Sequence, residues 1–99
     1  MVVYVDPPLW PRHGRVWGHL VSDASLDELH ALARDAGIPE RGFDLDHYDV
    51  PADLYPRLRD LGVVEVDTRD LVRLLRSSGL RVTAAERRRR RTPAPHELP

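Results

Sequence analysis

The alternation of apolar and polar residues along the chain predicts several short strands. The run "VVYV" at residues 2–5 is unbroken, apolar and rich in β-branched residues, and it ends at Asp6 before two prolines, so it predicts a buried strand. The run "VVEV" at residues 63–66 predicts a second strand for the same reason. Weaker signals predict a strand at residues 42–46 and an edge strand at residues 80–82.

Three other segments have the periodicity of helices. The clearest is "SLDELHALARDAG" at residues 25–37, where Ser25 and Glu28 have the spacing of a capping box and a glycine follows the last apolar position. A shorter helix is predicted for residues 53–61, capped by the aspartate at its start, and a third for residues 67–79. The order of strands and helices therefore alternates along the chain.

This alternation predicts a small α/β domain of two or three layers, with a short, mostly parallel sheet of three to four strands and about three helices. Residues 7–18 contain three prolines and two glycines and are predicted as a loop that folds back on the body. The single domain is expected to span residues 1–83. Residues 84–99, "AAERRRRRTPAPHELP", are expected to form a disordered arginine-rich tail.

Composition and charge narrow the class of protein. A chain of 99 residues with 41% hydrophobic and 31% charged residues is typical of one globular domain. Because it has no cysteine, a metal site would need histidine and carboxylate ligands. No segment resembles a membrane span or an export signal, which predicts a cytoplasmic protein. All 15 basic residues are arginines, and five of them lie consecutively in the tail, so the near-neutral total combines an acidic body with a basic tail.

Polar residues follow the predicted strands or precede the first predicted helix. In open parallel sheets, ligands bind beyond the carboxyl ends of the strands, so these side chains are expected to converge at one edge. Histidines in loops titrate near neutral pH and are frequent in binding sites, whereas aspartates before helices are more often caps. The candidates for catalysis and for a divalent metal are His19, Asp23, His47 and Asp49. Further candidates for ligand binding are Asp6, Trp17, Tyr48 and Asp67.

Several segments together resemble a known bacterial and phage family. The runs "VYVDPPLWP", "WGHLVSD", "LDELHALARDAGIP", "FDLDHYDVP" and "RDLVRLLR" occur in an order similar to that of the domain of unknown function 4031, over roughly residues 2–80. The resemblance implies no reaction, cofactor or partner. The segment before "HYD" is shorter here than the aromatic-rich insertion of relatives, which implies a more open pocket.

Two functions of different classes fit the sequence. The first is a small metal-dependent hydrolase, or an enzyme that binds a small phosphorylated ligand through a divalent metal ion. The second is a non-enzymatic module that binds a protein partner, in which the histidines and aspartates form a structural hydrogen-bond network. Contact of residues 87–91 with nucleic acid is a third, weaker interpretation, because the body of the protein is acidic.

Overall fold

The computed structural model describes residues 2–91, and for residues 90 and 91 the backbone alone. Its strands are β1 (Val3–Val5), β2 (Trp10–Arg12), β3 (Arg15–Ser22), β4 (Phe43–Asp44), β5 (His47–Pro51) and β6 (Val64–Glu65). The α-helices are α1 (Leu26–Ala36), α2 (Tyr55–Asp60), α3 (Thr68–Ser78) and α4 (Ala84–Arg91), and two short 3-10 helices are η1 (Glu40–Gly42) and η2 (Ala52–Leu54). None of the helices within the described residues has the length and apolar character needed to cross a membrane.

The six strands form one mixed sheet in the order β4-β5-β3-β1-β6, with β2 paired to β3. Every pair is antiparallel except β1 with β6. The prediction of a short, mostly parallel sheet of three to four strands is therefore wrong. The prediction fails because β3 returns antiparallel alongside β1 after the β2–β3 hairpin. The chain therefore lacks the crossover between β1 and its next neighbour that a parallel sheet requires.

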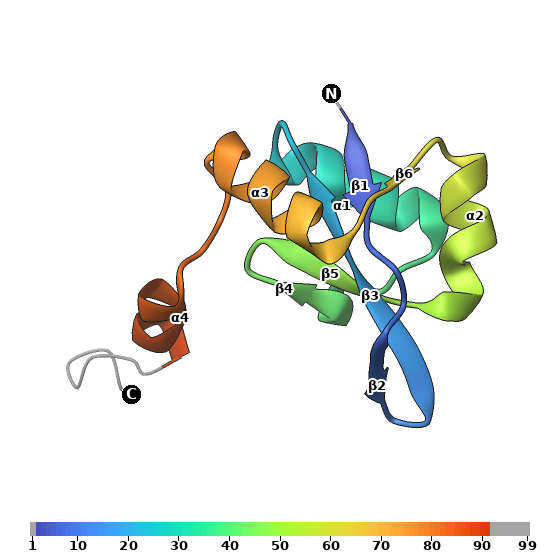
Figure 1. Ribbon diagram of the computed structural model, residues 1–99, viewed down its shortest axis with the longest axis horizontal. Coiled ribbons are helices and arrows are strands. Elements are labelled where there is room, and N and C mark those ends of the chain that lie inside the picture. Colours follow the sequence, from blue (N-terminus) through green and yellow to red (C-terminus); the bar gives the residue numbers. More distant parts are fainter. Residues whose placement is uncertain (1, 92–99) are drawn as a thin grey trace.

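The hairpin occupies the segment that was predicted as a loop. Trp10 on β2 pairs directly with Trp17 on β3, and the strands turn at His13 and Gly14, both with positive φ (52° and 73°). β2 pairs only with β3, which is compatible with Pro11 in its centre because its other side needs no ladder donor. The hairpin projects from the body of the molecule (Figure 1).

The helices agree better with the sequence pattern. The helix predicted for residues 25–37 is confirmed as α1, and Ser25 Oγ accepts a hydrogen bond from the Glu28 amide. The third helix is confirmed as α3, capped by Asp67. The second is α2, although Leu54 rather than the aspartate at position 53 stands at its N-cap, without a side-chain hydrogen bond.

The C-terminal predictions differ from the structure. Residues 80–82 form no strand, because the amide of Val82 donates to Asp46 Oδ2 instead of to a neighbouring strand. Residues 84–91, predicted as part of a disordered tail, form helix α4. Residues 92–99 lie outside the described part of the chain, and a domain boundary after residue 83 stays a prediction.

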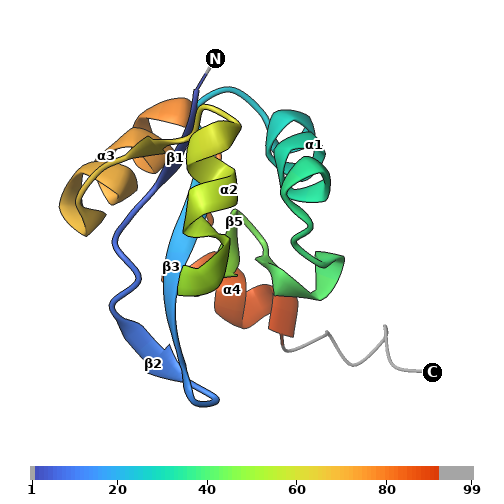
Figure 2. The same ribbon diagram turned by 90° about the vertical axis from the view of Figure 1, so that its right-hand side faces the viewer.

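The sheet carries helices on both faces, so the fold has three layers (Figure 2). Along β1, Val3 and Val5 point to the core under α1 and α2, whereas Tyr4 points to the smaller core under α3. The larger core includes Leu20 and Leu29, both with no exposed surface. On the α3 face, Val21 is the residue of β3 in the apolar core. His19 lies two residues earlier on the same face of the strand.

A glycine allows β3 to approach the loop that precedes the hairpin. A Cβ atom on Gly18 would lie 1.8 Å from the Tyr55 hydroxyl and 2.7 Å from the Asp6 carbonyl oxygen. The hydroxyl donates a hydrogen bond to that same carbonyl, and Tyr55 is 4% exposed. Gly18 therefore provides the space in which α2 fixes the backbone at Asp6.

Candidate functional site

Two adjacent strands place two histidines and an aspartate on one face of the sheet. His19 on β3 lies directly opposite Asp49 on β5, and His47 precedes Asp49 by two residues, so all three point to the same side. The two imidazole rings meet edge to face, with their centroids 5.2 Å apart. One ligand atom from each of the three residues lies within 4.8 Å of the other two. We call these three residues the triad.

Asp6, which follows β1, holds His19. Its carboxylate has no exposed surface, and Oδ1 accepts from the His19 amide at 2.6 Å. Oδ2 accepts from Thr68 Oγ1 at 2.8 Å and lies 3.0 Å from His19 Nδ1. Burial by itself would raise the pKa of Asp6, but the hydrogen bonds from His19 and Thr68 lower it below its ordinary value. Asp6 is therefore a carboxylate at neutral pH.

Trp10 competes with Asp6 for the same ring nitrogen. The indole Nε1 of Trp10 lies 3.1 Å from His19 Nδ1. An indole N–H only donates and a carboxylate only accepts, so Nδ1 bonds to Trp10 when unprotonated and to Asp6 when protonated. The buried charge of Asp6 favours the proton on Nδ1.

Asp46 holds His47 as Asp6 holds His19. It has no exposed surface, and it accepts hydrogen bonds from His47 Nδ1 at 2.7 Å, the Val82 amide at 2.8 Å and Arg87 Nη2 at 2.7 Å. Burial would raise the pKa of Asp46, but the hydrogen bonds from His47 and Val82 and the nearby charges lower it. A second cation, Arg81, lies 3.6 Å from Oδ2.

The charges of His47 and Asp49 depend on each other. Burial would lower the pKa of His47, but the hydrogen bonds to Asp46 and Asp49 raise it to about 9. For Asp49, burial would raise the pKa, but the hydrogen bonds from His47 and Arg12 lower it to about 2. His47 Nε2 lies 3.3 Å from Asp49 Oδ1, and Arg12 Nη2 donates to Asp49 Oδ2 at 2.8 Å. In the metal-free protein at neutral pH, an imidazolium thus lies between two carboxylates.

The structure separates the other predicted site residues from the triad. Asp23, predicted as a metal ligand, accepts from the Val2 amide beyond the far end of β3 and does not join the triad. Asp67 caps α3 through the Asp70 amide. Tyr48 points to the opposite face, where its hydroxyl lies 2.6 Å from His30 Nδ1. Asp23 and Asp67 were predicted from a parallel sheet edge that the structure does not contain, whereas Tyr48 was predicted as an aromatic neighbour of His47.

Two predicted residues and several unpredicted ones surround the triad. Asp6 is in contact with His19, and Trp17 lines a cavity together with Asp49. The contributions of Arg12, Asp46, Thr68 and Trp10 were not predicted from the sequence. One feature of the sequence could have indicated Asp46 as a site residue, because it directly precedes the "HYD" run that contains His47 and Asp49. Arg12 had none, since the hairpin that brings it to Asp49 was not predicted.

The comparison with known families agrees with the resemblance noted from the sequence. The family described as Protein of unknown function (DUF4031) matches residues 3–78. The chain belongs to this family. No curated protein and no solved structure gives a significant match. The DUF4031 match includes the whole triad together with Asp6 and Asp46, and it ends before α4.

Proposed function

We propose that this DUF4031 protein binds a divalent transition-metal ion through His19, His47 and Asp49 and uses it in a hydrolytic reaction. Two imidazoles and one carboxylate are a ligand set that suits zinc and similar ions. Three protein ligands leave coordination positions for water and a substrate. A metal ion in such a position lowers the pKa of bound water and polarises an ester or phosphoester oxygen.

The observation that carries the proposal is the pair of buried carboxylates behind the histidines. Asp6 lies against His19 Nδ1 and Asp46 against His47 Nδ1, and neither carboxylate is exposed. Histidines that bind metals usually donate their second ring N–H to such a carboxylate, which fixes the ring and leaves the other nitrogen for the ion. The same pairing on two neighbouring histidines supports a metal site more strongly than the three ligands do by themselves.

Metal binding requires a change of partners at the triad. The ion replaces the proton that His47 Nε2 shares with Asp49, and it competes with Arg12 for the carboxylate. With a pKa of about 9, removing this proton at pH 7 costs about 2.7 kcal/mol. Structural zinc sites of zinc-finger peptides provide roughly 10–16 kcal/mol at pH 7, so a cost of this size does not prevent metal binding.

A structural network with a protein-binding role is the second candidate function. Among the described residues, every buried polar side-chain atom has a hydrogen-bond partner, so the cluster is complete without an ion. The adjoining hairpin exposes Leu9, Trp10 and Val16, with 63%, 45% and 42% of their surfaces accessible. Trp10 and Val16 lie on opposite faces of the projecting hairpin, where exposed apolar side chains are accessible to a protein partner.

Metal titration distinguishes the two functions. Purified protein is stripped with chelator and titrated with Zn²⁺, Mn²⁺ and Co²⁺, with heat of binding and melting temperature as readouts. We expect 1:1 binding and, at one hundred times the dissociation constant, stabilisation of about 2.7 kcal/mol. The gain should disappear in His47→Ala and in Asp49→Asn, and persist in the control His13→Asn, which removes an exposed imidazole outside the triad.

Two results would contradict the metal centre. One is the absence of heat and of a thermal shift with all three ions while the protein stays folded. The other is binding that Asp49→Asn and His47→Ala leave unchanged, which would locate the ion elsewhere. If His47→Ala does not fold, Asp49→Asn decides, because Asp49 is only partly buried and can lose its charge without leaving a cavity.

A further inference from the structure

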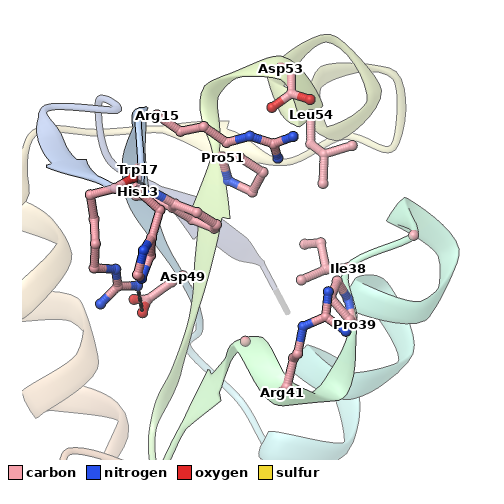
Figure 3. Close-up of a pocket in the computed structure, with 13 residues that line it drawn as sticks. His13, Arg15, Trp17, Ile38, Pro39, Arg41, Asp49, Pro51, Asp53 and Leu54 are labelled. Atoms are coloured by element: carbon pink, nitrogen blue, oxygen red, sulfur yellow. Dashed lines mark hydrogen bonds and ion pairs between the residues drawn. The ribbon is translucent and has the colours of Figure 1, made fainter.

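A second feature of the molecule is a cavity of about 460 Å³ beside the triad. It lies between the β2–β3 hairpin, the part of β5 beyond its pairing with β4, and the segment that connects α1 to η1 (Figure 3). Asp49 belongs both to the lining of this cavity and to the triad. Its volume is within the range of pockets that hold small organic ligands.

The walls of the cavity include a largely apolar, partly rigid surface. Ile38 is 5% exposed, Pro51 is buried, and Trp17 and Leu54 are half-buried. Trp17 pairs with Pro51 across β3 and β5, and its indole Nε1 donates to the Arg12 carbonyl at 2.9 Å, which fixes the ring. A flat ring can pack on such a surface with little loss of conformational entropy in the protein.

Two arginines that line the same cavity have guanidinium groups without an ion-pair partner among the described residues. Arg15 comes from β3 and extends toward Pro51 and Leu54, whereas Arg41 comes from η1 and lies beside Ile38 and Pro39 on the opposite wall (Figure 3). Neither guanidinium has a hydrogen-bond or ion-pair partner within residues 2–89. Arg12 also lines the cavity but is already paired with Asp49.

The charge of the lining is positive although the protein as a whole is not. Three arginines and two aspartates, Asp49 and Asp53, line the cavity, which leaves one net positive charge, whereas the whole chain has a net charge of −1. Asp53 is exposed and makes no ion pair with Arg15 or Arg41. Planar guanidinium groups bind phosphate oxygens through paired hydrogen bonds. The unpaired arginines therefore favour a phosphate-bearing ligand.

We propose that this cavity binds a nucleotide, with the phosphate between Arg15 and Arg41 and the base against Trp17 and Pro51. The proposal rests on the proposed function in one respect: the nucleotide is the substrate class of the triad because the cavity reaches Asp49. Binding through the arginines does not itself require a metal ion. The nucleotide is free in solution or is part of a single strand, since both present the same phosphate and base.

The test is a binding titration of the full chain. The probes are the four common nucleoside monophosphates, a single-stranded five-nucleotide DNA and inorganic phosphate, each in chelator and again with Zn²⁺. We expect a nucleoside monophosphate or the oligonucleotide to bind more tightly than inorganic phosphate in both conditions. The double substitution Arg15→Gln with Arg41→Gln should weaken binding about tenfold or more, because it removes two charge-assisted contacts.

The control is Arg76→Gln, which removes an exposed, unpaired arginine from the last turn of α3 and should leave the affinity unchanged. Saturable binding that depends on Arg15 and Arg41 supports the proposal whether or not Zn²⁺ binds. The oligonucleotide binding far more tightly than every monophosphate identifies a nucleic-acid strand as the source of the nucleotide, and the reverse identifies a free nucleotide.

Three results would overturn the inference. They are no binding of any probe in either condition, binding no tighter than that of inorganic phosphate, and binding that the double substitution leaves intact. Since Zn²⁺ binding is measured in the same samples, failure of the metal site is recorded separately from failure of the nucleotide site.

Discussion

Replacing Asp46 by asparagine tests whether a buried charge holds His47 and the C-terminal segment in place. The substitution keeps the size of the side chain but removes its charge and exchanges one acceptor oxygen for a donor. Asp46 now accepts from His47, the Val82 amide and Arg87 without any exposure of its own. An asparagine cannot accept from all three, so at least one donor loses its partner.

The size of the effect follows from the same contacts. The pKa of His47 is raised from 6.5 to about 9 although burial opposes the rise, so Asp46 and Asp49 together stabilise the imidazolium by at least about 3.4 kcal/mol. Half of this amount, together with a hydrogen bond to a charged group worth about 1.5–3 kcal/mol, gives a loss of at least about 3 kcal/mol. For a domain of this size, such a loss lowers the melting temperature by roughly 12–24 °C.

Urea unfolding in chelator at pH 6 measures the loss of stability, and a histidine-resolved NMR titration measures the pKa of His47. The pKa should fall toward its ordinary value in Asp46→Asn. Asp60→Asn is the control, because Asp60 is exposed in the last turn of α2 and its substitution should change stability by less than about 0.5 kcal/mol. A loss for Asp46→Asn no greater than that of the control, or an unchanged pKa of His47, would refute the reasoning.

Further predictions concern pH and the contact at Gly18. The pKa of His47 is raised to about 9, so its contribution to folding stability is fully present below pH 6.5 and is lost as the pH rises through 9. The pKa of Asp49 is lowered to about 2, so its contribution is present above pH 3.8 and is lost as the pH falls through 2. Metal-free protein should therefore have its highest melting temperature between about pH 4 and 6.5, and a melting temperature that rises from pH 7 to 9 would contradict this. Gly18→Ala should destabilise the protein by about 2 kcal/mol or more, measured by urea unfolding, because the new methyl group meets the Tyr55 hydroxyl. Adding Tyr55→Phe should recover part of that loss, since it removes the closest of the clashing atoms, and a purely additive double variant would show that the contact is not the cause.

The sequence predicted α1, α2 and α3, but not α4, because the signals of these three helices are local. The capping residue Ser25, the apolar spacing after it and a terminal glycine all lie within one segment, and they determine α1 without reference to the sheet. The same holds for Asp67 and α3. Strand pairing is not local, and the segment with two tryptophans contains three prolines that are typical of a loop. The hairpin tolerates Pro11 because β2 has only one partner strand, which no pattern in the segment itself indicates.

Most residues of the candidate site were predicted from the sequence, but their arrangement in the sheet was not. His19, His47 and Asp49 were chosen as polar residues at the edge of a parallel sheet, and they meet instead where the antiparallel strands β3 and β5 pair. Asp23 was chosen by the same argument and lies elsewhere, because β3 carries it to the opposite end of the sheet. The residue types indicated the chemistry, whereas their distances depend on a register that the sequence does not specify.

The shared use of Asp46 makes the C-terminal segment thermodynamically linked to the triad. The DUF4031 match ends at residue 78, yet Val82 and Arg87 supply two of the partners of the carboxylate that orients His47. A chain shortened to the matched residues would leave this anion with fewer donors, and its pKa and that of His47 would change together. A ligand or substitution that separates Arg87 from Asp46 would in the same way change the pKa of His47. Residues beyond the family match therefore help to set the pKa of a triad residue.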